Sequence, residues 1–296
     1  MKNILQKADS FFKKLFGNLD LTWKKLIIWA VIAGIYTGLM ALFSIFNDTS
    51  FEDISISFEW WILFGILIIV NSNSPLDSAL KCFVFFLISQ PLVYLVQAPF
   101  HWMGLELFKY YLPWFRWTLL TFPMGYIGYY IKRGDWWSLV ILAPMLVFVA
   151  SHYEGFAGEA RSFFPHHLLS AIFCAITLVL YPLYILKQKT VKKVGLAISI
   201  VLLLTGTAVA VLNRHVYNTT LMSSSEEHYF DDKYEVSLKD SRFGKVYIEW
   251  NEDMQCYMLQ AQFTAVGDTE LIIKAPDGSV KNYPLTVRRN GYDLDR

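Results

Sequence analysis

Seven apolar runs follow one another between residues 26 and 212, and they constrain the fold more than any other feature of the sequence. A bilayer has a hydrocarbon core about 30 Å thick, which a helix crosses in roughly 20 residues at about 1.5 Å per residue. The runs occupy residues 26–46, 58–71, 79–97, 115–130, 136–150, 166–186 and 194–212. This pattern predicts an α-helical polytopic membrane bundle of about seven transmembrane helices, of which the run at 58–71 is the shortest.

The composition supports a membrane protein and argues against several other classes. Hydrophobic residues make up 55% of the chain and charged residues 17%, whereas soluble domains carry about a quarter charged residues. The sequence has no basic patch interleaved with aromatics and no glycine-rich phosphate loop, so nucleic acid is not expected as a partner. No cofactor is predicted. Cys82, Cys174 and Cys256 lack the spacing of a disulfide framework or a zinc motif, and we expect them to be small buried residues.

The positive charges predict which ends of the runs face the cytoplasm, because Lys and Arg next to spans prefer that side. With seven crossings and a cytoplasmic N-terminus, that side holds six N-terminal lysines, Lys81, Lys132, Arg133 and the cluster LKQKTVKK at 186–193. The opposite side then holds Lys109, Arg116, Arg161 and Arg214 near the runs. If the run at 58–71 does not cross, this bias largely disappears. We therefore expect a multi-pass protein of the plasma (cell) membrane, with the acidic loop at 47–55 and everything after Leu212 outside the cytoplasm.

The segment before the first run has the pattern of an amphipathic helix. Apolar residues recur at helical spacing at Ile4, Ala8, Phe11, Phe12, Leu15 and Phe16, and the lysines lie mainly away from this stripe. Such a helix lies flat on an anionic membrane surface, with its lysines toward the phosphates. Residues 1–24 are therefore predicted as a cytoplasmic interfacial helix in front of a transmembrane bundle at 25–213. The alternative is a helix packed on a cytoplasmic loop.

The C-terminal quarter has a different character, because charges and turn signals replace the long apolar runs. VYIEW, CYMLQAQF, ELIIKA and NYPLTV have the pattern of strands, and APDGS has the pattern of a hairpin turn in which Gly278 takes positive φ. We expect a linker at 214–229, whose serines and acids stay solvated, and a small all-β domain at 230–296. The stretch TELIIKAPDGSVKNYPLTV resembles a bacterial extracytoplasmic immunoglobulin-like module, and the resemblance implies a β-sandwich without implying an activity.

The stretch SHYEGFAGEARSFFPHH at 151–167 contains three of the six histidines and lies between two apolar runs, on the predicted outer side. Zinc needs three or four N, S or O ligands. His152, Glu154 and His166 are suitable ligand types, but no H-E-x-x-H spacing is present, so a metal site is not predicted. The leading expectation is a hydrated, glycine-rich loop that caps the fifth and sixth helices. The open alternative is a role in contacting a ligand or sensing protons, since histidine titrates near neutral pH.

A second group of candidates lies between and within the neighbouring runs. The aromatic-rich loop QAPFHWMGLELFKYYLPWFR suggests a re-entrant or interfacial segment. Its residues His101 and Glu106 could meet the histidines of 151–167 across the outer surface. Arg116 either snorkels to lipid phosphates or binds an anionic group. The predicted ligand-binding set is Gln90, Tyr94, Gln97, His101, Glu106, Arg116, His152, Glu154 and His166.

Small residues and prolines mark where helices pack, kink or begin. Ala30, Gly34 and Gly38 recur at four-residue steps, which predicts a close helix–helix contact inside the bundle or, as the alternative, in a dimer. A proline falls inside each of four runs, at positions 91, 123, 144 and 182, and kinked helices there could enclose a cavity. Ser74, Pro75 and Asp77 have the pattern of a helix N-terminus.

Three classes of function are compatible with the sequence. The favoured one is a non-enzymatic membrane protein that binds or moves a small solute or lipid at an outward-facing site. The first alternative is a structural or sensory envelope protein whose β-domain contacts other envelope proteins. The second is a membrane-embedded metal-dependent enzyme that uses the outer His and Glu residues. No nucleophile elbow, paired catalytic carboxylates or metal motif is present, so no catalytic residue is predicted. Membrane lipids are expected partners in every case.

Overall fold

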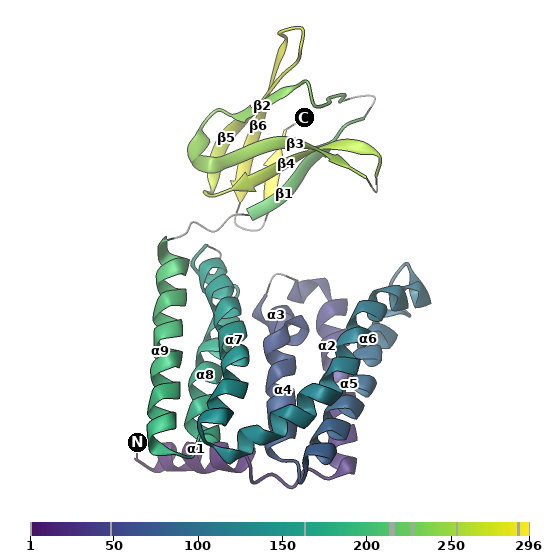
Figure 1. Cartoon of the computed structure of the whole chain (residues 1–296). Coiled ribbons are helices and arrows are strands. Elements are labelled where there is room, and N and C mark those ends of the chain that lie inside the picture. The colour runs from purple at the N-terminus through teal and green to yellow at the C-terminus, as the bar shows by residue number, and fades with distance from the viewer. Residues whose placement is uncertain are drawn as a thin grey trace. The chain divides into compact units, whose positions relative to one another are not determined.

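The chain forms two compact units, a helical unit and a β unit, each described here by itself. The computed structural model describes residues 2–47, 49–162, 164–212, 217–225, 228–252, 254–288 and 291–295. The helical unit comprises Met1–Ala160 and Phe164–Val209, and the β unit comprises Arg161–Phe163 and Ala210–Arg296 (Figure 1).

The helical unit is built from nine described helices. They are α1 (Lys2–Leu15), α2 (Trp23–Leu42), α3 (Ser50–Ile56), α4 (Phe58–Val70), α5 (Pro75–Gln97), α6 (Tyr111–Gly128), α7 (Trp136–Ser162), α8 (Leu168–Ile185) and α9 (Lys189–Leu212), with α7 and α9 ending in the β unit. The α-helical class with a C-terminal β region is confirmed.

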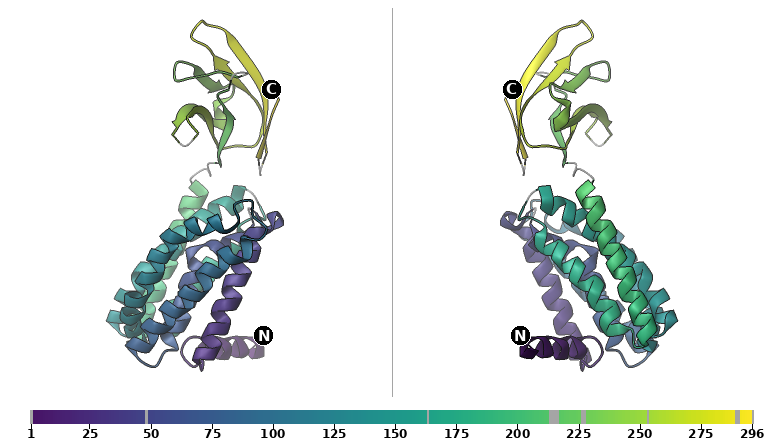
Figure 2. Two further views of the ribbon diagram at one scale, coloured as in Figure 1. Left: turned by 90° about the vertical axis from the view of Figure 1, so that its right-hand side faces the viewer. Right: turned by 90° about the vertical axis from the view of Figure 1, so that its left-hand side faces the viewer.

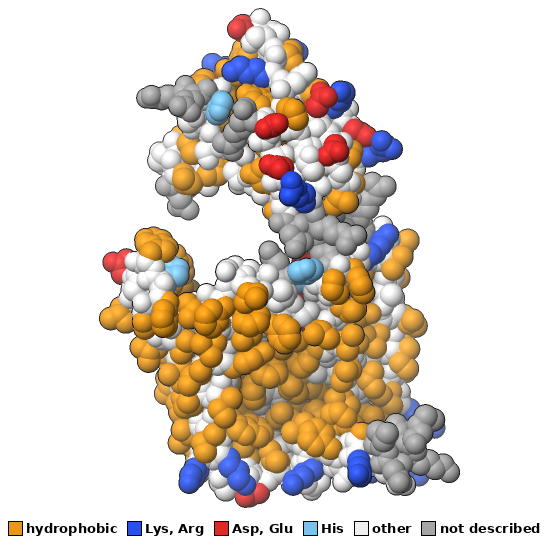
Figure 3. Space-filling model, turned by 180° about the vertical axis from the view of Figure 1, so that it is seen from behind, with side chains coloured by type: hydrophobic (Ala, Val, Ile, Leu, Met, Phe, Trp, Pro, Cys, Tyr) orange, Lys and Arg blue, Asp and Glu red, His pale blue; other side chains and the backbone are white. Residues whose placement is uncertain are grey.

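Within the described ranges, five helices are long and apolar enough to cross a membrane: α2, α5, α7, α8 and α9. The pair α3 and α4 passes the same test as one broken span that is bent by 50°. The helix α6 has 18 residues but is not among the candidates, because Arg116, two prolines and two tyrosines lower its mean hydropathy. Apolar side chains cover the visible face of the helical unit in a broad band, with Lys and Arg at one end and histidines at the other (Figure 3). Seven crossings therefore stay a prediction.

The amphipathic helix α1 packs on the protein itself, across one end of the bundle (Figure 2). At the end of this segment Phe16 is buried against Tyr181 of α8, with ring centroids 6.1 Å apart. The Asn71 side chain at the end of α4 donates to the Leu15 carbonyl at 2.8 Å and accepts from the Leu19 amide at 2.8 Å. The helix is therefore tethered to the bundle helices rather than to a loop, whereas contact of its exposed Phe11 with lipid stays a prediction.

One charged pair of α1 also reaches the bundle. Asp9 lies 2.6 Å from Lys13 and accepts a hydrogen bond at 3.2 Å from the Tyr184 hydroxyl. The hydrogen bond from Lys13 lowers the pKa of the Asp9 carboxyl, and the bond from Tyr184 acts in the same direction.

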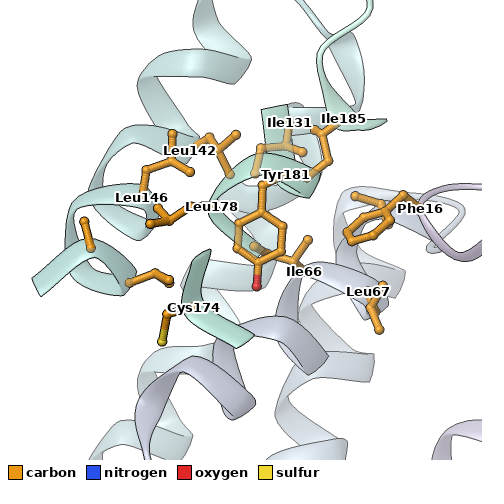
Figure 4. Close-up of a cluster of buried hydrophobic side chains, with 13 residues drawn as sticks. Phe16, Ile66, Leu67, Ile131, Leu142, Leu146, Cys174, Leu178, Tyr181 and Ile185 are labelled. Atoms are coloured by element: carbon orange, nitrogen blue, oxygen red, sulfur yellow. The ribbon is translucent and has the colours of Figure 1, made fainter. Parts of the chain in front are cut away.

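Among the described residues, the bundle has two large apolar clusters and a small one at Leu139, Leu186 and Val191. In the first, Tyr181 packs between Ile66, Leu178 and Phe16, so that α4, α8 and the end of the α1 segment share one core (Figure 4). The second joins α2, α4 and α5. In that cluster a Cβ added at Gly34 would lie 2.5 Å from the backbone oxygen of Ser89. The small residues of α2 therefore serve internal packing, as the sequence pattern favoured.

The predicted start of a helix at Ser74 and the predicted positions of prolines inside four helices are both confirmed. Ser74 caps α5 by accepting from the Asp77 amide at 3.1 Å, and Pro75 takes the first helical position. Prolines 91, 123, 144 and 182 lie inside α5, α6, α7 and α8, respectively. Cys82 and Cys174 are buried as expected, while Cys256 is half-buried.

The β unit consists of two antiparallel sheets around one core. Its strands are β1 (Tyr217–Ser223), β2 (Glu235–Leu238), β3 (Gly244–Asn251), β4 (Cys256–Phe263), β5 (Gly267–Lys274), β6 (Val280–Arg288) and β7 (Gly291–Leu294). The strand orders are β1-β4-β3 and β2-β5-β6-β7. Leu259 and Phe263 of β4 share the core with Leu271 of β5 and Leu285 of β6. The hairpin at APDGS joins β5 to β6, with Gly278 at φ 84°. The likeness to an immunoglobulin-like module stays a prediction.

The first strand lies in a segment that the sequence predicts as a linker. Residues 217–223 pair with β4, so this part of the range 214–229 belongs to the sheet and is not a linker. The register shifts between Thr220 and Met222, and Leu221 and Met222 are both buried. This bulge interrupts the alternation by which a strand is recognised in sequence.

Candidate functional site

The stretch 151–162 is helical rather than a loop, because α7 continues without a break from Trp136 to Ser162. Two glycines in this stretch do not end the helix, since Tyr153 and Phe156 pack against the apolar core and hold it in place. The prediction of a hydrated, glycine-rich loop is therefore wrong for 151–162, whereas residues 164–167 form turns. The consequence is that His152, Phe156 and Glu159 are spaced at i, i+4 and i+7 and lie on one face of α7.

At the centre of the site is a buried carboxylate, Glu59, which faces His152. Glu59 lies in the first turn of α4, where the helix dipole favours a negative charge, and it is 1% exposed. Its Oε1 is 2.5 Å from Nδ1 of His152. The contact has ion-pair distance without hydrogen-bond alignment, and neither carboxylate oxygen accepts a hydrogen bond from a described group. The His152 ring lies against that of Phe148, with centroids 4.7 Å apart and the ring planes tilted by 31°.

A second carboxylate–histidine pair lies at the start of α8. Asp53 of α3 is 2.6 Å from Nδ1 of His167 and accepts a hydrogen bond from the Ser170 hydroxyl at 2.9 Å. Glu159 of α7 lies 3.5 Å from the same Nδ1. His167 has φ 62° and gives α8 no side-chain cap, so the Ser50 hydroxyl of α3 accepts from the Leu169 amide at 3.1 Å instead.

The two carboxylates lie on either side of the break between α3 and α4. The 50° bend falls at Ser57, whose backbone is extended. Asp53 precedes the break and Glu59 follows it, and histidines from α7 and the start of α8 contact them. In membrane proteins, broken helices occur where the backbone lines a cavity or binds a solute.

The His152 side of α7 borders an open pocket of about 300 Å³. Its lining residues are Ser151, His152, Gly155, Phe156 and Glu159. The His152 side chain is 31% exposed while its partner Glu59 is 1% exposed, so the imidazole lies between a buried carboxylate and the pocket. Because Nδ1 is the ring nitrogen next to Glu59, Nε2 is the one left for a ligand.

The other sequence-predicted residues lie apart from this pocket. His101 accepts from the Met103 amide at 3.2 Å, Glu106 is exposed, and Arg116 is exposed on α6. Within α5, Gln97 donates to the Val93 carbonyl at 2.9 Å, Gln90 is buried, and the Tyr94 hydroxyl donates to the Tyr110 carbonyl at 3.3 Å. Glu154 of α7 packs near Gly206 of α9, and the ring of His166 lies beside that of His167. No described contact brings His101 or Glu106 to the histidines of 151–167.

Sequence reasoning missed Asp53 and Glu59 as site residues. The one available signal was that the orientation argument placed the acidic loop at 47–55 on the same side as the histidines. The pairing of these acids with the histidines depends on how α3 and α4 pack against α7 and α8. No spacing of residues in the sequence predicts that packing.

A metal site is not supported by this arrangement. In the described part of the chain, no group of three or more His, Cys, Asp or Glu side chains has a geometry that could hold a metal ion. The residues considered as weak metal candidates have different neighbours. His152 contacts Glu59, Glu154 lies near Gly206, and His166 lies beside His167.

Comparisons with protein-family models, with curated proteins and with solved structures each found no match to this chain.

Proposed function

We propose that this chain is a multi-pass membrane protein that binds a small solute, and in doing so can move it, at the pocket lined by His152. The observation that carries the proposal is the Glu59 carboxylate, which is almost fully buried behind the partly exposed imidazole of His152. Removing a carboxylate from water costs several kcal/mol even in relaxed proteins. An ionisable residue inside a membrane bundle is accordingly a hypothesis of function by default.

We further propose that the pocket faces outward across a plasma membrane that the chain crosses seven times. The broken pair α3 and α4 then forms the second crossing and α6 the fourth. The N-terminus lies in the cytoplasm, and the β unit, with its resemblance to an immunoglobulin-like module, lies outside. The support for this topology is the excess of Lys and Arg on the side of the N-terminus.

The contacts favour binding over covalent catalysis. A serine nucleophile needs an imidazole next to its hydroxyl, with the carboxylate behind the imidazole. At Ser170 the order differs, because the hydroxyl donates to Oδ2 of Asp53 and Nδ1 of His167 contacts the same oxygen, so the carboxylate lies between the serine and the histidine. This arrangement holds His167 at the start of α8 without activating the serine.

The proposal is tested by the thermal stability of the purified full-length protein in detergent. A panel of small primary amines, carboxylates, phosphates, neutral amino acids and sugars is added in turn. We expect at least one class to raise the unfolding temperature with increasing concentration, because a ligand at 100 times its Kd stabilises the folded state by about 2.7 kcal/mol.

The matched variants are His152→Ala and His101→Ala. The shift is expected to vanish in His152→Ala and to persist in His101→Ala, since His101 lies in the segment between α5 and α6. If no compound class raises the unfolding temperature, or if the rise is equally large in His152→Ala, the pocket is not a solute site.

A further inference from the structure

We infer that the solute recognised by the pocket carries a primary ammonium group, and that this cation replaces a proton on His152. This inference rests on the proposed function and names its substrate class. It starts from the charge of Glu59, a side chain 1% exposed whose described ionic partner is His152. A carboxyl buried to this extent keeps its negative charge only with a compensating positive charge nearby. Without a ligand, the His152 proton supplies that charge.

The groups around the pocket match the donors of an ammonium ion. An alkylammonium has three N–H donors and no acceptor. The Nε2 of His152, once its proton has left, is an acceptor that faces the pocket. The Ser151 hydroxyl donates to the Phe148 carbonyl at 2.8 Å, which leaves its oxygen lone pairs for a ligand. The carboxylate of Glu159 is a third lining acceptor, and the Phe156 ring provides a π face for a cation.

The same lining disfavours other charged solutes. An anion in the pocket would lie next to the carboxylate of Glu159 and in front of that of Glu59. A quaternary ammonium has the correct charge but no N–H to donate to Nε2. A divalent metal lacks a set of three or more suitable side chains in the described residues. The lining therefore selects for positive charge together with N–H donors.

The exchange balances in charge and in protons. Before binding, the site holds the Glu59 carboxylate and the His152 imidazolium. After binding, His152 is neutral with its Nδ1 proton toward Glu59, Nε2 accepts a hydrogen bond from the ammonium, and one proton has passed to solvent. The titratable groups near the pair are Glu159 of α7, Asp53 of α3, His167 before α8, and Cys174 and Tyr181 of α8, the last two of which interact with Glu59. Because protons compete with the cation, binding is tighter at higher pH.

The test is calorimetric titration of ethylammonium chloride into the full-length protein in phosphatidylcholine nanodiscs. We expect Kd to be at least tenfold lower at pH 7.5 than at pH 5.5. We also expect a proton to be released near pH 6, measured as a difference in heat between amine-free buffers of unlike ionisation enthalpy. Tetramethylammonium is expected to bind at least tenfold more weakly. Equal binding of both cations, or binding without proton release, would overturn the inference.

Variants separate this role from a structural one. His152→Gln keeps an acceptor but cannot titrate, so the pH dependence of Kd should flatten while binding persists. Glu154→Gln, a change of an acid on the same helix that does not line the pocket, should leave Kd unchanged. If a variant fails to fold, the pH dependence of Kd for ethylammonium in the unaltered protein still tests whether the cation displaces a proton.

The same calorimetric titration in nanodiscs distinguishes two sources of the ammonium group. If the physiological source is a phosphatidylethanolamine headgroup, equimolar phosphatidylethanolamine in the nanodisc raises the apparent Kd for ethylammonium; if it is a soluble amine, the value stays the same. Should the panel described above show instead that a carboxylate or phosphate binds at His152, the proposed function stands and the ammonium inference fails. If no compound in the panel binds, the proposed function and the ammonium inference both fail.

Discussion

Replacing Glu59 and His152 together by leucine is expected to abolish solute binding while leaving the protein at least as stable as before. A buried ion pair loses about as much through desolvation as it gains by attraction, and apolar substitutes of similar volume are often neutral or stabilising by about 1–4 kcal/mol. Here the cost is pronounced, because neither oxygen of the buried Glu59 carboxylate accepts a hydrogen bond from a described group. A pair that destabilises the fold and is nevertheless present indicates a role in function.

The measurement is the free energy of unfolding in denaturant, followed by tryptophan fluorescence, alongside calorimetry with ethylammonium. The single variant Glu59→Gln is the matched comparison, since it keeps the shape of the side chain and removes the charge that the cation requires. Binding is expected to weaken at least tenfold in Glu59→Gln. If the double leucine variant instead loses 3 kcal/mol or more, the pair is structural and the argument from burial fails.

Gly34→Ala is expected to destabilise the bundle by about 1–3 kcal/mol, the usual cost of overfilling a packed core. A Cβ at this position would lie 2.5 Å from the Ser89 carbonyl oxygen and 2.8 Å from Cβ of Leu92, both on α5. The first of these is backbone, so relief requires α2 and α5 to move apart.

Gly65→Ala is the matched control, because it also adds one methyl group to a glycine inside an apolar helix. Nothing lies within 4 Å of a Cβ at Gly65, so the substitution is expected to stabilise by up to about 1 kcal/mol through helix propensity. The two substitutions should therefore change the free energy of unfolding, measured in the same detergent, with opposite signs. Equal effects would mean that α2 and α5 are not in close contact.

Local chemistry made several parts of the fold predictable from sequence. The start of α5 follows from Ser74 and Pro75, and the turn at Gly278 follows from the APDGS motif, because in each case a few adjacent residues determine the backbone. The close approach of α2 to α5 follows from small residues at four-residue steps. The strand β4 follows from the alternation of apolar and polar residues in LQAQF.

What could not be predicted depends on tertiary contacts. Gly155 and Gly158 suggested a loop, yet packing of neighbouring aromatics keeps α7 helical and brings Glu159 onto the same face as His152. The contact of Glu59 with His152 joins residues that are far apart in the chain. The strand β1 was obscured by a bulge that buries two consecutive side chains.

The most direct test of the account is labelling of Gly155→Cys by a membrane-impermeant maleimide on intact cells. Gly155 lines the pocket and a Cβ there meets nothing within 4 Å, so a cysteine fits without strain. The background carries Cys82→Ala, Cys174→Ala and Cys256→Ser, and Lys14→Cys, at an exposed position of α1, serves as the comparison. The account predicts that Gly155→Cys is labelled from outside and is protected by ethylammonium, and that Lys14→Cys is labelled only after the cells are permeabilised. Labelling of Gly155→Cys only after permeabilisation would contradict an outward-facing pocket.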